Sequence, residues 1–114
     1  MVDNSLDIRC IVAVVERGKA ENVVKAAKKA GATGATVFYA RGMGEKEAKK
    51  FLDMHIESSK EIIMILSEAS KKDNIIAAMT EAGKLNDPGT GIIFSVQIDD
   101  LIGLHHRKNL NYEN

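Results

Sequence analysis

The chain has 114 residues, which favours a single domain spanning 1–114 with a core of useful size. Sixteen basic residues balance sixteen acidic ones, so the sequence lacks the excess of cations that drives binding to nucleic acids or membrane surfaces. Aromatic residues make up only 4%, which removes the stacking platform typical of single-stranded RNA binders.

The compartment is predicted from the cysteine content and the N-terminal sequence. The single cysteine, Cys10, lies in an apolar run and is interpreted as a buried thiol in a reducing compartment. No apolar run approaches the roughly 18 residues that span a bilayer. The first residues, MVDNSLDIR, lack the basic and then apolar layout of a signal peptide. We expect a cytoplasmic protein that does not insert into membranes.

Three elements are predicted in the first half of the chain. Ile8–Val15 is short, apolar and rich in β-branched residues, which is typical of a strand. Ala20–Gly31 places apolar residues at helical spacing, with lysines on the other face, and Gly31 suits the position after a helix end. Thr33–Ala40 is again typical of a strand.

The second half repeats this order. Glu61–Leu66 is a predicted strand, and Thr90–Ile98 is another. Between them, Lys72–Gly83 contains a predicted helix, with Gly83 at the position that follows the helix end. Ser70 with Asp73 resembles a capping box at the start of the second helix.

The two halves align as an internal repeat. AENVVKAAKKAG matches KDNIIAAMTEAG, and each is followed by Thr-Gly and a β-rich segment that contains phenylalanine. A βαβ unit written twice predicts an α+β, ferredoxin-like βαββαβ sandwich: a four-stranded antiparallel sheet with two helices on one face.

The second face of that sheet is predicted to be buried as well. In Cys10–Val15 and Ile62–Leu66 both alternating sets of side chains are apolar, whereas a strand with one solvated face alternates apolar and polar residues. Two helices cover only one face, so we expect other copies of the chain to cover the second.

Two segments of the sequence resemble those of a known family. GATGATVFYARGMG (residues 31–44) and AGKLNDPGTGIIFSVQIDDLIGL (residues 82–104), in this order and spacing, resemble the nitrogen regulatory P-II proteins, and this chain is similar to divergent P-II-like members. The resemblance runs from about Ile8 to His106. It implies a homotrimer that binds an adenine nucleotide (ATP, ADP or AMP) between subunits and regulates a partner protein, for which a membrane transporter is one candidate.

The resemblance also implies nucleotide-binding positions. Gly34 and Thr36 match the Gly-x-Thr beside the adenine, and Gly42 and Gly44 match the Gly-x-Gly near the ribose and phosphate. The phosphate-wrapping segment corresponds to Gly83, Lys84, Asp87, Gly89, Thr90 and Gly91.

Several basic residues of the family pattern are replaced here. No lysine follows Gly91. Two phosphate-binding arginines are expected where this chain has Gly103 and His105. Glu45-Lys46 replaces the Arg-Gln of the family. Each lost charged hydrogen bond should cost about 1.5–3 kcal/mol. We therefore expect a less charged adenine nucleotide or another small anion rather than a tightly held triphosphate.

The connection at 43–60 corresponds to the family's T-loop, which docks on partners. Its candidate partner-binding residues are Glu45, Lys46, Lys49, Lys50, Phe51 and His55. Such length between strands is unusual in a compact domain, yet EKEAKKFLDM is rich in helix formers. A short helix on the oligomer surface and a mobile docking loop are both consistent with this composition. Residues 107–114 are interpreted as a C-terminal tail.

Two other functional classes were considered. A small acylphosphatase-type enzyme shares the fold, but no catalytic constellation stands out, and we expect no catalysis. Trimeric metal-tolerance proteins share it too. His105 and His106 near Asp99 and Asp100 have no metal-ligand spacing, and no metal site is predicted.

Overall fold

The computed structural model describes residues 7–42 and 58–103 of the chain. Six elements follow one another: β1 (Ile8–Glu16), α1 (Ala20–Lys29), β2 (Thr36–Gly42), β3 (Ser58–Glu68), α3 (Ala69–Gly83) and β4 (Gly91–Gln97). All neighbouring strands are antiparallel, and the sheet order is β2-β3-β1-β4. This confirms the predicted ferredoxin-like βαββαβ arrangement.

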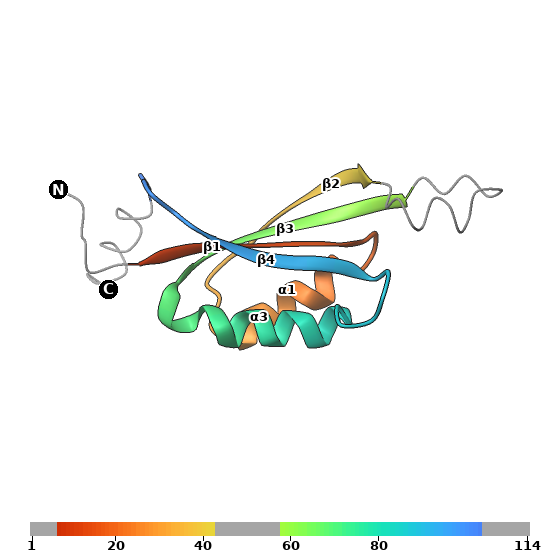
Figure 1. Ribbon diagram of the computed structural model, residues 1–114, viewed down its shortest axis with the longest axis horizontal. Helices are drawn as coiled ribbons and strands as arrows, with labels where there is room; N and C mark the ends of the chain where they lie inside the picture. Colours follow the sequence, from red (N-terminus) through yellow and green to blue (C-terminus); the bar gives the residue numbers. More distant parts are fainter. Residues whose placement is uncertain (1–6, 43–57, 104–114) are drawn as a thin grey trace.

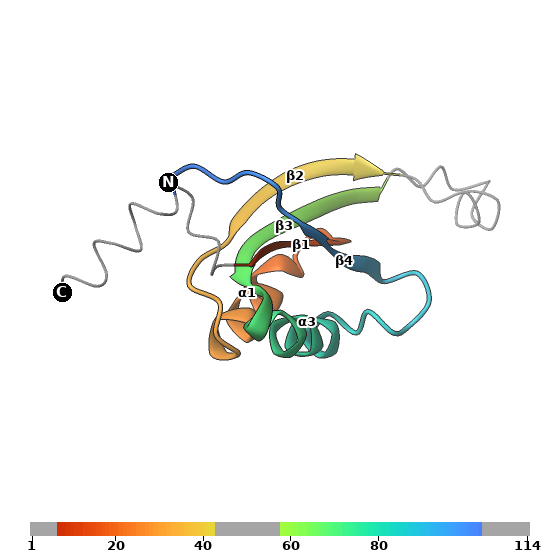
Figure 2. The same cartoon turned by 60° about the vertical axis from the view of Figure 1, so that its left-hand side comes forward.

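Both helices lie on the same side of the sheet, as Figures 1 and 2 show. Successive side chains of a strand point to opposite faces of the sheet. In β1, the side chains that face the helices are Ile11, Ala13 and Val15, and all three are apolar and buried. The core that they form is completed by Ile63, Ile65, Val23, Ala27, Ile75 and Met79. The repeated 3.6-residue stripe in the sequence therefore faces the sheet, as predicted.

The opposite side of the sheet, which we call the open face, is also apolar. Directly opposed residues of antiparallel strands point to the same side, so the register defines three rows. These rows are Leu66, Cys10 and Val96; Met64, Val12 and Phe94; and Ile62, Val14 and Ile92. Ile92 remains 58% exposed and Phe94 45% exposed. The prediction of a second apolar face is confirmed, and no element of the described ranges covers it.

Element boundaries differ from the predictions mainly around the second helix. α3 begins at Ala69, so Ser70 lies inside its first turn, and Glu68 is the N-cap residue without a side-chain capping bond. The capping box predicted for Ser70 and Asp73 is wrong. β3 begins at Ser58, so the last residues of the connection predicted over 43–60 belong to a strand. The short helix considered within that connection falls outside the described residues, as does the tail at 107–114.

None of the helices in the described ranges is both long and apolar enough to span a membrane.

Candidate functional site

The loop between α3 and β4 begins with a left-handed residue. Lys84 has φ +54 and ψ +44, and its N–H donates to the carbonyl oxygen of Glu81 at 3.2 Å. The N–H of Leu85 donates to the carbonyl oxygen of Thr80 at 2.9 Å. Together these bonds form a Schellman ending in which the left-handed position is filled by lysine rather than glycine. The prediction that Gly83 follows the helix end is wrong, since Gly83 is the last residue of α3.

Two glycines of the expected phosphate-wrapping segment are needed for close packing. A Cβ on Gly83 would lie 3.2–3.3 Å from side-chain atoms of Leu85 and Val23. A Cβ on Gly91, where φ is +150, would overlap the carbonyl oxygen of Val14 in β1. Gly83 therefore serves helix packing, and Gly91 lets β4 approach the centre of the sheet.

The side chain of Thr90 is hydrogen-bonded to the backbone of its own loop. Its hydroxyl oxygen lies 2.7 Å from the carbonyl oxygen of Lys84 and 3.0 Å from that of Asp87, so its one proton is shared between two acceptors. The N–H of Asp87 donates back to the carbonyl oxygen of Lys84 at 3.0 Å. These donors are engaged within the loop. A ligand here would meet Gly89 and the exposed side chains of Lys84 and Asp87, whose charges are opposite.

The remaining nucleotide-binding candidates that the structure describes belong to the other edge of the sheet. Thr36 opens β2 opposite Met64, which places its side chain on the open face, and Gly42 closes β2 opposite Ser58. Gly34 lies in the loop before β2, where a Cβ would meet no atom within 4 Å. Gly44 and the partner-loop candidates Glu45, Lys46, Lys49, Lys50, Phe51 and His55 lie outside the described residues.

One chain does not bring the two groups of candidates together. β2 and β4 are the two edge strands, separated by β3 and β1, so roughly 14 Å of sheet lies between them at ~4.8 Å per strand spacing. Gly42 and Gly91 do share one end of the sheet, because Gly42 pairs with Ser58 and Gly91 with Val15. Within one chain, the two groups of candidates therefore lie on opposite edges of the sheet.

The first helix begins against a buried carboxylate that the sequence analysis missed. Oε1 of Glu61 in β3 accepts hydrogen bonds from the N–H of Gly18 at 3.0 Å and of Ala20 at 2.9 Å. The side chain is only 8% exposed. A carboxylate at a helix N-terminus is favoured by the helix dipole as well as by the bonds. The sequence signal was a charged residue on the apolar face of a strand.

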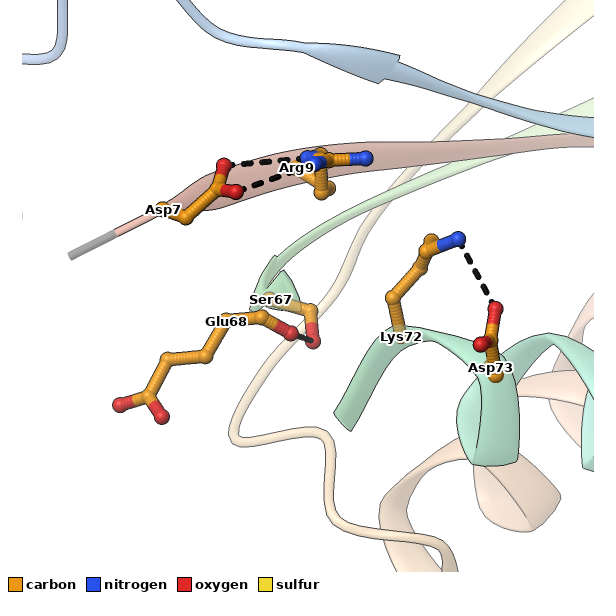
Figure 3. A network of polar contacts seen from close by, with 6 residues as sticks. All are labelled: Asp7, Arg9, Ser67, Glu68, Lys72 and Asp73. Carbon is orange, nitrogen blue, oxygen red and sulfur yellow. Dashed lines mark hydrogen bonds and ion pairs between the residues drawn. The ribbon is translucent and has the colours of Figure 1, made fainter. Parts of the chain in front are cut away.

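The start of α3 is arranged differently. The N–H of Ala69 donates to the backbone carbonyl of Asp7 at 2.7 Å, and ion pairs lie nearby rather than a capping carboxylate. Figure 3 shows Arg9 paired with Asp7 at 3.0 Å and Lys72 with Asp73 at 2.8 Å. Hydrogen bonds from the Arg9 guanidinium hold the pKa of the Asp7 carboxyl below its usual value. The Lys72 ammonium lowers the pKa of Asp73 in the same way.

Ser67 and Glu68 mark the passage from β3 into this helix. The Ser67 hydroxyl donates to the carbonyl oxygen of Glu68 at 2.8 Å (Figure 3). This bond fixes the last strand residues but does not cap the helix.

Neither a reactive cysteine nor a metal site is supported by the residues that the structure describes. Burial raises the pKa of the Cys10 thiol, which disfavours the reactive thiolate. No group of three or more His, Cys, Asp or Glu side chains within residues 7–42 and 58–103 could hold a metal ion. His105 and His106 lie outside these ranges.

The chain is thus a ferredoxin-like domain with a bare apolar sheet face and with candidate ligand residues divided between the two edges of its sheet. The protein-family model of nitrogen regulatory protein P-II matches residues 8–108. The chain belongs to the nitrogen regulatory protein P-II family.

Solved structures support the same fold. The chain is similar to the Arabidopsis thaliana PII protein bound to citrate, with a TM-score of 0.68 and 23% sequence identity. The match covers 88% of this chain and 85% of the plant chain. At this identity the likeness concerns the fold. A search of curated proteins found no significant match.

Proposed function

We propose that this chain is a P-II-like regulatory protein that assembles as a homotrimer, binds a small effector between subunits and controls a partner protein through the connection at 43–60. The observation that carries this proposal is the division of the expected ligand residues between β2 and the 84–91 segment, on opposite edges of one sheet. A neighbouring copy that offers its 84–91 segment to the β2 edge would unite them. Family membership supports this regulatory role over an acylphosphatase-type enzyme or a metal-tolerance protein.

The open face supports the oligomeric part of the proposal. Monomers rarely expose a contiguous apolar patch that runs across a whole sheet, and such patches usually mark an interface. Light scattering should give three times the mass of one chain at micromolar concentration. Replacement of Phe94 by Asp at the middle of the open face should produce smaller species, whereas Asn74→Asp on the exposed helical side should not.

The effector is proposed to be an adenine nucleotide with modest charge, AMP or ADP before ATP. Among the described residues of the 84–90 loop, Lys84 is the sole cation, and Asp87 opposes it. The plant PII structure holds citrate, which supports a small anion as the second candidate class. Calorimetry against ATP, ADP, AMP and citrate tests the order. Thr36→Val should weaken nucleotide binding, while Thr33→Val, on the exposed loop before β2, should leave it unchanged.

A mixing experiment tests whether the site lies between copies. Thr36→Trp should block the β2 side of the site and Lys84→Glu the loop side, so neither variant alone should bind. Refolding the two together should restore about a quarter of the sites, because that fraction of the interfaces joins two intact sides in a cyclic assembly. If each site belonged to one chain, mixing would restore none.

The partner is proposed to be a protein, with a membrane transporter as the first candidate. An effector can shift the connection at 43–60 only if it binds one state of the assembly more tightly than another. Capture of solubilised membrane proteins by the full chain, with and without AMP, should depend on the effector and should fail when residues 46–56 are deleted. Capture that is indifferent to both changes would contradict this part of the proposal.

A further inference from the structure

The helix layer has a hollow between its two helices. α1 and α3 lie side by side on one side of the sheet and run in opposite directions (Figure 1). The hollow has a volume of about 430 Å³ and is lined by three residues of each helix: Ala26, Lys29 and Ala30 of α1, and Ala78, Glu81 and Ala82 of α3. Lys29 and Glu81 are exposed, so the hollow opens to solvent.

The lining of this hollow follows the internal repeat. When AENVVKAAKKAG is aligned with KDNIIAAMTEAG, every lining residue of α1 has a lining residue of α3 as its equivalent: Ala26 with Ala78, Ala30 with Ala82, and Lys29 with Glu81. The hollow therefore lies on the approximate twofold axis that relates the two halves of the chain. Its two sides match in shape at the alanines and are opposite in charge at the third position.

The two opposite charges beside the hollow are not used within the chain. In the part of the chain that the structure describes, the side chains of Lys29 and Glu81 form no ion pair or hydrogen bond. Their neighbour Lys25, by contrast, is paired with Glu21 of the same helix at 3.8 Å. A surface with an unpaired cation on one side and an unpaired anion on the other is complementary to itself after a twofold rotation.

Two face-to-face arrangements of a second copy fit the shape of this surface. A twofold axis across the helices places α1 against α1 of the partner copy, whereas an axis along the helices places α1 against α3. Because the repeat makes the two helices similar in shape, charge decides between the arrangements. The first opposes Lys29 to another Lys29, and α1 carries three lysines and one glutamate, so two cationic helices would meet. The second opposes each Lys29 to Glu81 of the other copy.

We propose that the helix layer is a self-association surface, on which a second copy packs about a twofold axis along the helices with Lys29 of each copy against Glu81 of the other. In a four-helix bundle the groove between one pair of helices faces the groove of the other pair, and the alanine lining lets the helices approach closely. The surface lies on the opposite side of the sheet from the open face, so the proposal rests on neither the proposed trimer nor the effector site. Alanines bury little apolar area, and we expect weak pairing that depends on concentration.

Sedimentation velocity on the full chain tests this contact. The Phe94→Asp variant removes the association proposed for the open face and leaves the helix layer unchanged. From about 10 μM to about 1 mM, this variant should convert from a monomer to a dimer. In the same background, Lys29→Glu and Glu81→Lys should each weaken the dimer about tenfold or more, because each change replaces two attractions by two repulsions. Both side chains are exposed, and circular dichroism confirms that the variants fold.

A double charge reversal separates a positioned pair from a general effect of net charge. Lys29→Glu combined with Glu81→Lys rebuilds both pairs with their signs exchanged, and should restore the dimer to within about threefold of the parent. The matched control combines Lys28→Glu with Glu81→Lys, which gives the same net charge from a lysine that does not line the hollow. This control should stay at least about tenfold weaker, because Lys29 then faces a second lysine.

Three results would overturn the proposal: a monomer at every concentration, undiminished pairing in the Lys29→Glu variant, or equal restoration by the double reversal and its control. A monomer at every concentration would leave the hollow to a helix of another protein. The Lys29→Glu change in the otherwise unaltered chain should leave the mass of the proposed trimer unchanged at micromolar concentration. The two contacts can therefore fail independently.

Discussion

The two halves of the repeat use the same order of elements but hold their helices by different means. α1 begins at the buried carboxylate of Glu61, whereas α3 begins at the backbone carbonyl of Asp7. Arg9 stands as far before the last residue of β1 as Glu61 stands before the last residue of β3. The same place in the repeat thus carries an anion in one half and a cation in the other. Similar sequence periodicity can therefore be combined with opposite electrostatics at equivalent helix starts.

The Thr-Gly step before the last strand of each half gives the largest expected contrast. Gly91→Ala should lower the free energy of unfolding by about 3 kcal/mol or more, because the new Cβ would overlap the carbonyl oxygen of Val14 and φ is +150. Gly34→Ala, at the matching position, should change it by less than about 0.5 kcal/mol, since the space there is open. Urea unfolding of both variants measures the difference. Equal effects would mean that the two Thr-Gly steps have the same role.

The helix starts give the next contrast. Glu61→Ala should cost about 2–4 kcal/mol, because it leaves the N–H groups of Gly18 and Ala20 without a charged acceptor. Glu61→Gln retains an acceptor and should cost less. Arg9→Ala is the matched change in the other half and should cost clearly less than Glu61→Ala, because the ion pair of Arg9 with Asp7 is partly exposed and screened by solvent. Similar losses in Arg9→Ala and Glu61→Ala would contradict this assignment.

The helix ends differ by one residue type. Gly31 has φ +122 at the end of α1, while Lys84 fills the left-handed position after α3. A lysine in the left-handed conformation destabilises the folded state by about 1–2 kcal/mol. Glycine removes this strain, but its flexibility also stabilises the unfolded chain and offsets part of the gain. Lys84→Gly should therefore stabilise the protein by about 0.5–1 kcal/mol in urea unfolding. Destabilisation would indicate that the Lys84 side chain contributes more to the fold than its exposed position suggests.

Lowering the pH should weaken the ion pairs at the start of α3 and slightly reduce the stability of the protein. The folded-state pKa values of Asp7 and Asp73 are lowered by Arg9 and Lys72, so the unfolded chain takes up their protons first as the pH falls. Stability from these pairs is present above the unfolded value of about 3.9 and is lost as the pH drops through the folded values. The fall in melting temperature between about pH 5 and pH 3 should thus be smaller in Asp7→Asn than in the wild type. Asp87→Asn, in the exposed 84–90 loop, is the matched control; an equal change there would contradict this role for Asp7.

Local patterns in the sequence were enough to predict the element order, the topology and the second apolar face. Helical spacing placed α1 correctly from Ala20, and runs without polar alternation identified β1 and β3. The details that failed depend on tertiary context. Ser70 looks like a cap, yet the helix starts one residue before it, and the αL position fell on Lys84 although Gly83 is next to it.

The candidate site was less predictable than the fold. The resemblance selected positions along the chain, but their division between the edges of the sheet follows only from the strand order β2-β3-β1-β4. The role of Glu61 depends on a contact between β3 and the start of α1, segments that are distant in sequence. No local pattern reports such pairings.

The three rows of apolar side chains on the open face also have a consequence for folding in the cell. If other copies cover this face, the stability of each chain depends on how many others are present, because mass action couples assembly to folding. A dilute chain then has a lower apparent melting temperature than a concentrated one. Newly made copies expose an adhesive surface until they meet. The abundance of this protein would therefore help to set the lifetime of every copy.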